Sequence, residues 1–270
     1  MSKLRLLFIG DVVGKPGQLL VRKWLPHLRR ENNIDGVILN GENSANNGRG
    51  ISPKVADDFF ELGVDVITTG NHIWDQREIV GYIATKPKLL RPLNYPNFTP
   101  GKGYVFADIK GTKIAVINAL GRVFFRENME CPFRAIDSIL PVIKSQTNLI
   151  FLDFHAEASS EKHALSFYLD GKITGMVGTH THVQTADERV LPGGTAFISD
   201  LGCGGSINSC LGMKKEIIIQ KFLNQMPAKF DVCTEPPFML NGVIIEADTE
   251  TGKAVSIKRF QIIDEEALDI

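Results

Sequence analysis

The chain has 270 residues, of which 43% are hydrophobic and 23% charged, a composition ordinary for a globular protein that buries a sizeable core. Its 30 basic and 31 acidic residues give a formal net charge of -1, so no strongly basic surface is available for extended nucleic acid. No apolar stretch reaches the roughly 18 residues that span a membrane, and we predict a single domain over residues 1–270.

The cysteines and the N-terminus indicate the cellular compartment in which the protein works. Four cysteines are present without a Cys-x-x-Cys pair, and Lys3 and Arg5 lead directly into a short apolar run where a secreted protein would carry a signal peptide. We therefore expect a cytoplasmic protein.

Polar residues of ligand type follow each of the first three apolar runs that we predict to be strands. The runs are 4–9, 37–39 and 64–68, and the residues that follow them are Asp11, Glu42 with Asn43, and Asn71 with His72. Open α/β sheets bind ligands outside the carboxyl ends of their strands, so these side chains are well placed for chemistry.

The remaining segments predict a mixed α/β protein. Helices are expected over 17–30, 53–62, 132–144 and 159–169, and 216–222 is a short helix or strand. Pro26 predicts a kink or an early end in the first helix. Residues 79–100, with four prolines, predict a long surface connection. The runs 104–108 with 113–118, and 242–247 with 255–262, predict hairpins, so the sheets should be mixed.

Four other segments keep two readings each. Arg49, in the Asn- and Gly-rich loop 44–52, could contact a phosphate or be a solvated loop residue. Phe124 and Phe125 are interpreted as core residues, with a base-stacking wall as the alternative. The Gly-rich stretch 201–211 could offer backbone N–H groups to an anion or form a plain turn. The acidic tail from Asp264 is frayed or docked.

His180 and His182 follow the strand predicted over 173–177, and His155 follows the one predicted over 149–154. Residues two apart on a strand project to one face, so His180 and His182 should point the same way. Neutral imidazole is the commonest metal ligand, which makes this pair half of a metal site; a polar pair near a turn is the alternative. With the carboxylates and amides at the other strand ends, the set could hold two divalent cations bridged by one carboxylate.

These motifs resemble a known family. The residues concerned are Asp11, Gly70-Asn71-His72, His155 and Gly178-Thr179-His180-Thr181-His182, and they are similar to the motifs of the calcineurin-like metallophosphoesterases. Val13 stands where the superfamily's first motif has histidine, and Gly41-Glu42-Asn43 replaces its usual second motif. Both departures resemble the bacterial YmdB-type cyclic nucleotide phosphodiesterases.

The resemblance implies a fold, a ligand set and a cofactor. The fold would be a four-layer α/β/β/α sandwich with two mixed β-sheets. One cation would be held by Asp11, Glu42 and His182, and the other by Glu42, Asn71, His155 and His180. Glu42 would be the bridge. The two ions would be Fe and/or Mn, with Mg as a further option, and the chains would form homo-oligomers.

A mechanism follows from such a centre. Two cations lower the pKa of a shared water toward about 7, and the resulting bridging hydroxide attacks phosphorus. His72 would be the general acid that protonates the departing alkoxide, or it would stabilise the equatorial oxygens of the phosphate. Asn43 would orient a ligand or the substrate, or cap its loop. Asp75 and Asp187 would hold histidines in place.

Three functions are therefore weighed. The leading one is a phosphodiesterase for 2′,3′-cyclic or 3′,5′-cyclic nucleotides. A phosphomonoesterase or phosphoprotein phosphatase would use the same centre, because leaving-group specificity lies in the loops. A regulatory, RNA-associated protein with a mainly structural metal centre is the third, and the near-neutral charge argues against extended RNA binding.

Overall fold

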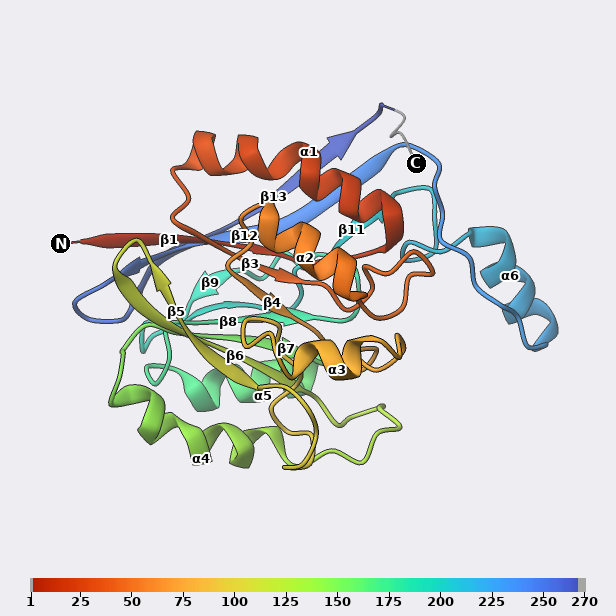
Figure 1. Ribbon diagram of the computed structural model, residues 1–270. Helices are drawn as coiled ribbons and strands as arrows, with labels where there is room; N and C mark the ends of the chain where they lie inside the picture. The colour runs from red at the N-terminus through yellow and green to blue at the C-terminus, as the bar shows by residue number, and fades with distance from the viewer. Residues whose placement is uncertain (1, 267–270) are drawn as a thin grey trace.

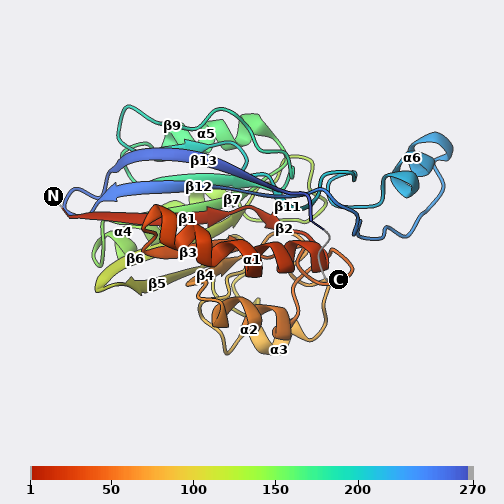
Figure 2. The same cartoon turned by 90° about the horizontal axis from the view of Figure 1, so that it is seen from above.

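The computed structural model describes residues 2–266 and shows two β-sheets packed face to face between outer layers of helices (Figures 1 and 2). The helices are α1 (Gly14–Asn32), α2 (Pro53–Glu61), α3 (Ile79–Ile83), α4 (Pro132–Lys144), α5 (Ser159–Leu169) and α6 (Lys215–Asn224). Helices α1, α2 and α3 cover the first sheet, and α4 and α5 cover the second. The predicted four-layer α/β/β/α architecture is confirmed.

The first sheet has seven strands. They are β1 (Lys3–Ile9), β2 (Asp11–Val12), β3 (Gly36–Asn40), β4 (Val66–Thr68), β11 (Cys203–Ser206), β12 (Phe238–Asp248) and β13 (Ala254–Asp264). Their order is β2-β11-β12-β1-β3-β4, with β13 paired to β12. Strand β1 runs parallel to β3 and antiparallel to β12, so the sheet is mixed.

The second sheet has six strands. They are β5 (Tyr104–Ile109), β6 (Thr112–Leu120), β7 (Ile150–His155), β8 (Gly175–Thr179), β9 (Arg189–Val190) and β10 (Ala196–Ile198), in the order β5-β6-β7-β8-β10-β9. Strands β6, β7 and β8 are parallel, whereas β5 and β9 are antiparallel to their neighbours. Both predicted hairpins, β5 with β6 and β12 with β13, are confirmed.

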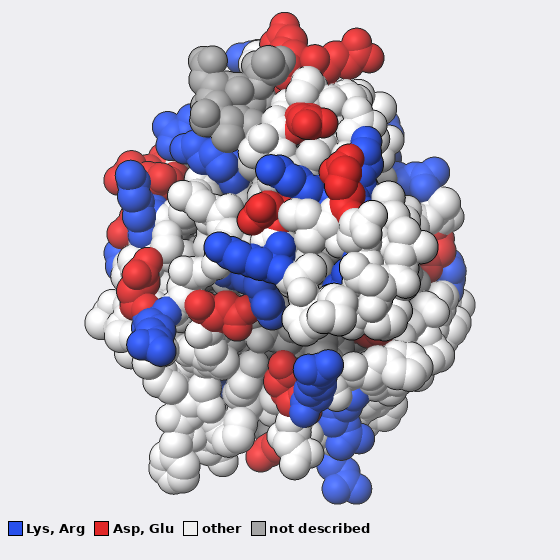
Figure 3. Space-filling view, turned by 90° about the vertical axis from the view of Figure 1, so that its right-hand side faces the viewer, with Lys and Arg blue, Asp and Glu red and all other residues white. Residues whose placement is uncertain are grey.

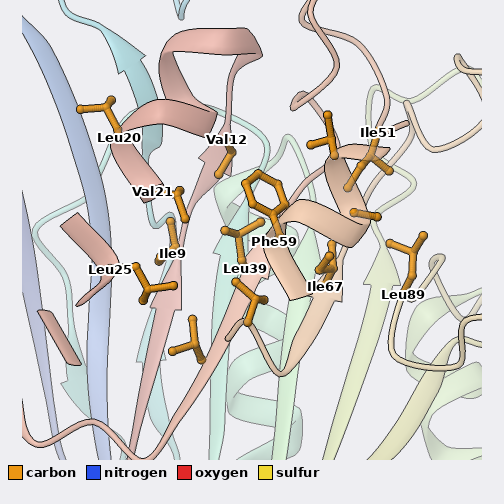
Figure 4. Close-up of a cluster of buried hydrophobic side chains, with 14 of the residues drawn as sticks. Ile9, Val12, Leu20, Val21, Leu25, Leu39, Ile51, Phe59, Ile67 and Leu89 are labelled. Carbon is orange, nitrogen blue, oxygen red and sulfur yellow. The ribbon is translucent and has the colours of Figure 1, made fainter. Parts of the chain in front are cut away.

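Strand alternation distributes the core over three interfaces. On β1, Leu6 and Phe8 face the second sheet, whereas Leu7 and Ile9 face the helices. Figure 4 shows the helix side, where Ile9 lies near Val21 and Leu25 of α1. Each such buried side chain contributes about 1.5–3 kcal/mol relative to an exposed one. This burial on both faces keeps the strand ends at a fixed edge.

Three local expectations differ from the structure. Helix α1 does not end early at Pro26 but continues to Asn32, because Leu25 and Leu28 on either side of the exposed Pro26 are buried in the core. The Gly-rich stretch is not a plain turn, because it contains strand β11, and its Gly202 N–H already donates to Asp200. The connection 79–100 contains α3 and buries Leu89 and Leu90 in the core.

Segment 216–222 is helical, as part of α6. This helix stands apart from the two sheets in both views (Figures 1 and 2), and within residues 2–266 it buries none of its side chains. At the C-terminal end, Asp264 is buried and accepts hydrogen bonds from Lys23 and Trp24, which confirms docking at that residue. Residues 267–270 of the predicted tail lie outside the described part of the chain. No helix within the described residues is long and apolar enough to cross a membrane.

Candidate metal centre

The predicted ligands meet at the carboxyl ends of β1, β3, β4, β7 and β8, an edge that faces right in Figure 1. Asp11, Glu42 and His155 are buried, and His180 is partly exposed. The parallel strands deliver residues far apart in sequence to one edge, which is why strand ends alone could predict the set.

Hydrogen bonds fix the tautomer of His155. The Thr179 hydroxyl donates to Asp153 Oδ1 at 2.7 Å, so it accepts the N–H of His155 Nδ1 at 2.9 Å. The other ring nitrogen, Nε2, then carries a lone pair. It lies 3.0 Å from Glu42 Oε1 and 3.2 Å from Asn71 Oδ1, which are also acceptors.

His180 presents its other nitrogen. Its Nε2 lies 2.9 Å from Glu157 Oε2, so that carboxylate favours the tautomer with the proton on Nε2. In that tautomer Nδ1, which lies 3.0 Å from His155 Nε2, is unprotonated. The backbone N–H of His180 donates to Asp11 Oδ2 at 2.8 Å, which ties the loop to the end of the first sheet.

His182 and Asn43 face each other in the same manner. His182 Nδ1 donates to the Leu211 carbonyl at 3.0 Å, and Asn43 Nδ2 donates to the Gly48 carbonyl at 3.0 Å. The remaining atoms, His182 Nε2 and Asn43 Oδ1, are both acceptors and lie 3.2 Å apart. Asp11 Oδ2 lies 3.8 Å from the same nitrogen. Asn43 therefore faces a predicted ligand rather than serving only its loop.

These contacts fit divalent cations. Lone pairs that face each other at 3.0–3.2 Å repel unless a cation or a proton lies between them. Glu42, His155 and His180 offer ligand atoms that all lie within 4.8 Å of one another. Among the described residues, the buried Asp11 Oδ1 has no hydrogen-bond partner. Mixed oxygen and imidazole donors suit first-row divalent metals.

Burial and the neighbouring charges shift the pKa values of His155 and Glu42 in opposite directions. Burial lowers the pKa of His155, but the carboxylates of Glu42 and Asp11 outweigh it and raise that pKa to about 9. Burial raises the pKa of Glu42, and the His155 charge outweighs it and lowers that pKa to about 2. Burial and the His155 charge lower the pKa of His180 to about 3. A protonated His155 thus supplies, among these carboxylates, the positive charge that a cation would otherwise supply.

The loop 180–182 is not a continuation of the strand. His180 and His182 have φ values of 102° and 63°, in the left-handed region, so the strand alternation on which the prediction relied does not extend to these residues. Asp200 holds this loop by accepting the Thr181 N–H at 3.0 Å. Lys162 pairs with Asp200 at 2.8 Å, and both side chains are buried.

Gly70 lets the two sheets meet closely at the centre. A Cβ atom at this position would lie 2.3 Å from Glu42 Oε2 and 2.4 Å from His155 Nε2. No side chain fits there without displacing these two residues. The glycine that precedes Asn71 is therefore required by the close approach of Glu42 and His155.

His72 lies at the rim of the centre. Its backbone N–H donates to Glu42 Oε2 at 3.2 Å, and its Nδ1 lies 3.0 Å from Asp75 Oδ2. Arg49 Nε lies 3.0 Å from the same Asp75 oxygen. Asp75 thus holds a histidine, as predicted. Asp187 contacts His163, which is not among the predicted ligands.

The placement of Phe124 and Phe125 in the core was wrong. Phe124 is 83% exposed, and Phe125 lies with its ring centroid 4.9 Å from that of His180. These rings have no core position because the loop after β6 turns outward over the centre. They line the hollow beside the centre, and their stacking on a base, the alternative interpretation, stays a prediction.

Sequence reasoning missed the groups that orient the ligands. Glu157, two residues after His155, and Thr179, before His180, could have been found from their spacing to histidine. The residues that α6 and the following loop bring to this edge, such as Lys221 and Phe230, carried no signal, because nothing in the sequence predicts where an unburied helix lies.

Two face-to-face mixed sheets with this cluster at their strand ends define a fold of the metallophosphoesterase type. The model of a family described as YmdB-like protein matches residues 7–260. A Bacillus subtilis (strain 168) protein named 2′,3′-cyclic-nucleotide 2′-phosphodiesterase is 45% identical over 262 residues, covering 97% of this chain and 98% of its own length. The chain therefore belongs to the YmdB-like family.

Two crystal structures are also similar. A protein described as a novel phosphatase from Mycoplasma pneumoniae has a TM-score of 0.92 at 34% identity, covering 98% of this chain and 95% of that one. A hypothetical protein from Thermus thermophilus has a TM-score of 0.89 at 36% identity, covering 97% of this chain and all of the other.

Proposed function

We propose that this chain hydrolyses cyclic nucleotides at a centre of two divalent cations. The class of enzyme, a phosphoric diester hydrolase, follows from family membership and the name of the B. subtilis relative. The observation that carries the two-cation proposal is the set of acceptor atoms that converge on His155 Nε2 and His182 Nε2, where a positive charge is needed between them.

The contacts divide the ligands into two groups. Glu42, Asn71, His155 and His180 would hold one cation, and Asp11, Glu42 and His182 the other. Asn43 would orient His182 and join the second group through Oδ1. Fe or Mn suits this mixture of nitrogen and oxygen better than Mg, which prefers oxygen alone. Two cations bound here would neutralise charge on the phosphate and lower the pKa of a water molecule, so that it could lose a proton and attack phosphorus as hydroxide.

His72 is the proposed general acid. Asp75 accepts from Nδ1 and so orients the ring, and Nε2 would give a proton to the leaving alkoxide. Arg49, paired with Asp75, lies in the same pocket and would contact the phosphate. Phe125 would offer an apolar face to the nucleobase beside the centre.

The name of the B. subtilis relative favours the 2′,3′-cyclic over the 3′,5′-cyclic class of substrate. The name of the M. pneumoniae structure favours phosphatase activity as a second candidate, since a monoester could occupy the same centre. One substrate panel separates them: 2′,3′-cyclic AMP, 3′,5′-cyclic AMP, a bis-aryl phosphate and an aryl monophosphate, with and without Mn²⁺.

We expect metal-dependent hydrolysis of 2′,3′-cyclic AMP that His72→Ala and Glu42→Gln reduce by at least 100-fold. The matched controls are His27→Ala and Glu61→Gln, because both residues are exposed on helices outside the site. Cleavage of the monoester alone would replace the diesterase proposal with the phosphatase. Metal binding without any ester cleavage would leave the regulatory, RNA-associated reading with a structural metal centre.

A further inference from the structure

Two hollows open onto the metal centre and share a border. One, of about 530 Å³, is walled by Phe124, Phe125 and Arg126, and we call it the Phe125 branch. The other, of about 800 Å³, is walled by Lys221, Lys229 and Phe230, and we call it the Phe230 branch. The residues that line both are Arg49, His72, Glu157 and His180. The predicted general acid therefore lies where the two branches meet.

The Phe125 branch offers aromatic surface and the guanidinium groups of Arg49 and Arg126, which lie among the carboxylates of Asp75, Glu127 and Glu157. The Phe125 ring lies 4.9 Å from the His180 ring, and Phe124 is 83% exposed beside it. The Phe124 backbone has φ of 69°, a region that bulky residues seldom adopt. Arg126 adds a guanidinium to the same wall. Exposed rings beside a cationic group suit a nucleobase joined to a phosphate.

The Phe230 branch has the same chemistry but comes from a different part of the chain. Lys221 Nζ lies 4.6 Å from the centroid of the Phe230 ring, and Lys229 lines the same hollow. Both lysines come from α6 and the loop after it. This segment stands out from the sheets on the side where the strands end (Figures 1 and 2). Its pocket face supplies a second aromatic and cationic wall.

A cyclic nucleotide has one nucleoside and can fill only one branch. We propose that the site also cleaves linear phosphodiesters of dinucleotide size, with the scissile phosphate at the junction and one nucleoside in each branch. This inference rests on the proposed function. Basic and acidic side chains are interspersed over this face (Figure 3), so it lacks the continuous positive field that a long chain would need.

The reaction is a hydrolysis and needs no further reactant. A water oxygen forms a bond to phosphorus, and the ester bond from phosphorus to one nucleoside oxygen breaks. The leaving alkoxide takes a proton from His72, and the proton lost by water returns to solvent or to His72. The products are one nucleoside and one nucleoside monophosphate.

The test compares adenylyl-(3′→5′)-adenosine with 2′,3′-cyclic AMP on the metal-loaded protein. For the dinucleotide, Phe125→Ala and Phe230→Ala should each lower kcat/KM by about tenfold or more, since each removes one stacking wall. For the cyclic nucleotide the two losses should be unequal, because one base occupies one branch. Phe222→Ala is the matched control: it lies on α6, is 76% exposed and lines neither branch. Thermal melting checks that each variant is folded.

The two proposals fail differently. If the protein cleaves 2′,3′-cyclic AMP but not the dinucleotide, the two-branch inference is wrong and the proposed function stands. Dinucleotide cleavage that survives in both phenylalanine variants also overturns the inference. If neither substrate is cleaved with any metal, both proposals are wrong.

Discussion

His155 Nε2 lies 3.0 Å from His180 Nδ1, while His155 Nδ1 hydrogen-bonds to Thr179 and His180 Nε2 lies 2.9 Å from Glu157 Oε2. Two imidazole lone pairs held this close need a positive centre between them. The hydrogen-bond partners, more than the histidines themselves, thus direct the ligand atoms inward.

Gly70→Ala should abolish tight metal binding while leaving the fold intact. The added Cβ would meet Glu42 Oε2 at 2.3 Å and His155 Nε2 at 2.4 Å, so both ligands must move. We expect at least a 100-fold loss of activity and of metal affinity, measured by calorimetry. Gly81→Ala in α3 is the control, since its Cβ would meet nothing within 4 Å. Unchanged metal affinity in Gly70→Ala would contradict the geometry of the centre.

Glu157→Ala should weaken binding of the cation that we propose His180 holds. Without the carboxylate that lies 2.9 Å from Nε2, the His180 ring is free to turn and to change tautomer. Loss of such a partner costs about 10- to 100-fold in metal affinity. Glu157→Gln retains an acceptor oxygen and should recover most of the loss in a metal titration. Equal effects of the two substitutions would argue against an orienting role.

Lys162→Met should be strongly destabilising. It leaves the buried Asp200 carboxylate without its cation, and Asp200 also holds the loop 180–182 through the Thr181 N–H. Breaking a buried pair on one side costs about 3–5 kcal/mol in the free energy of unfolding, measurable in urea. Adding Asp200→Asn should restore part of this stability. The exposed Lys144→Met should change it by less than about 0.5 kcal/mol.

Asp264 should make stability depend on acidic pH. Burial raises its pKa, but hydrogen bonds from Lys23 and Trp24 outweigh this and hold the pKa below its ordinary value. A depressed pKa stabilises the fold above the unfolded pKa of about 3.9, and that stability is lost as the pH falls through the folded pKa. At pH 7 the free energy of unfolding of the wild type should exceed that of Asp264→Asn by about 1–2 kcal/mol. Urea unfolding at pH 7 and pH 3 should show the difference shrinking; a constant difference would refute this role.

The strand ends could be predicted because a buried strand is recognisable from the short apolar run of its own residues. Apolar runs predicted the inner strands, and parallel strands bring Asp11, Glu42, Asn71 and His155 to one edge whatever the connections between them. His180 and His182 reached the site as well, although through left-handed backbone angles that no alternation rule anticipates.

What the sequence did not predict depends on tertiary contacts. Phe125 looks like a core residue, and only the outward turn of its loop makes it a wall of the site. Pro26 looks like a helix end until the burial of Leu25 and Leu28 is known. The position of Phe230 follows from where α6 stands, which local pattern cannot specify.

The central claim is tested most directly by titrating Mn²⁺ into the metal-free chain while following hydrolysis of 2′,3′-cyclic AMP. The two ligand groups that share Glu42 predict that activity rises until close to two equivalents per chain are bound. Activity complete at one equivalent, or no hydrolysis at any ratio with the metal bound, would contradict the two-cation diesterase.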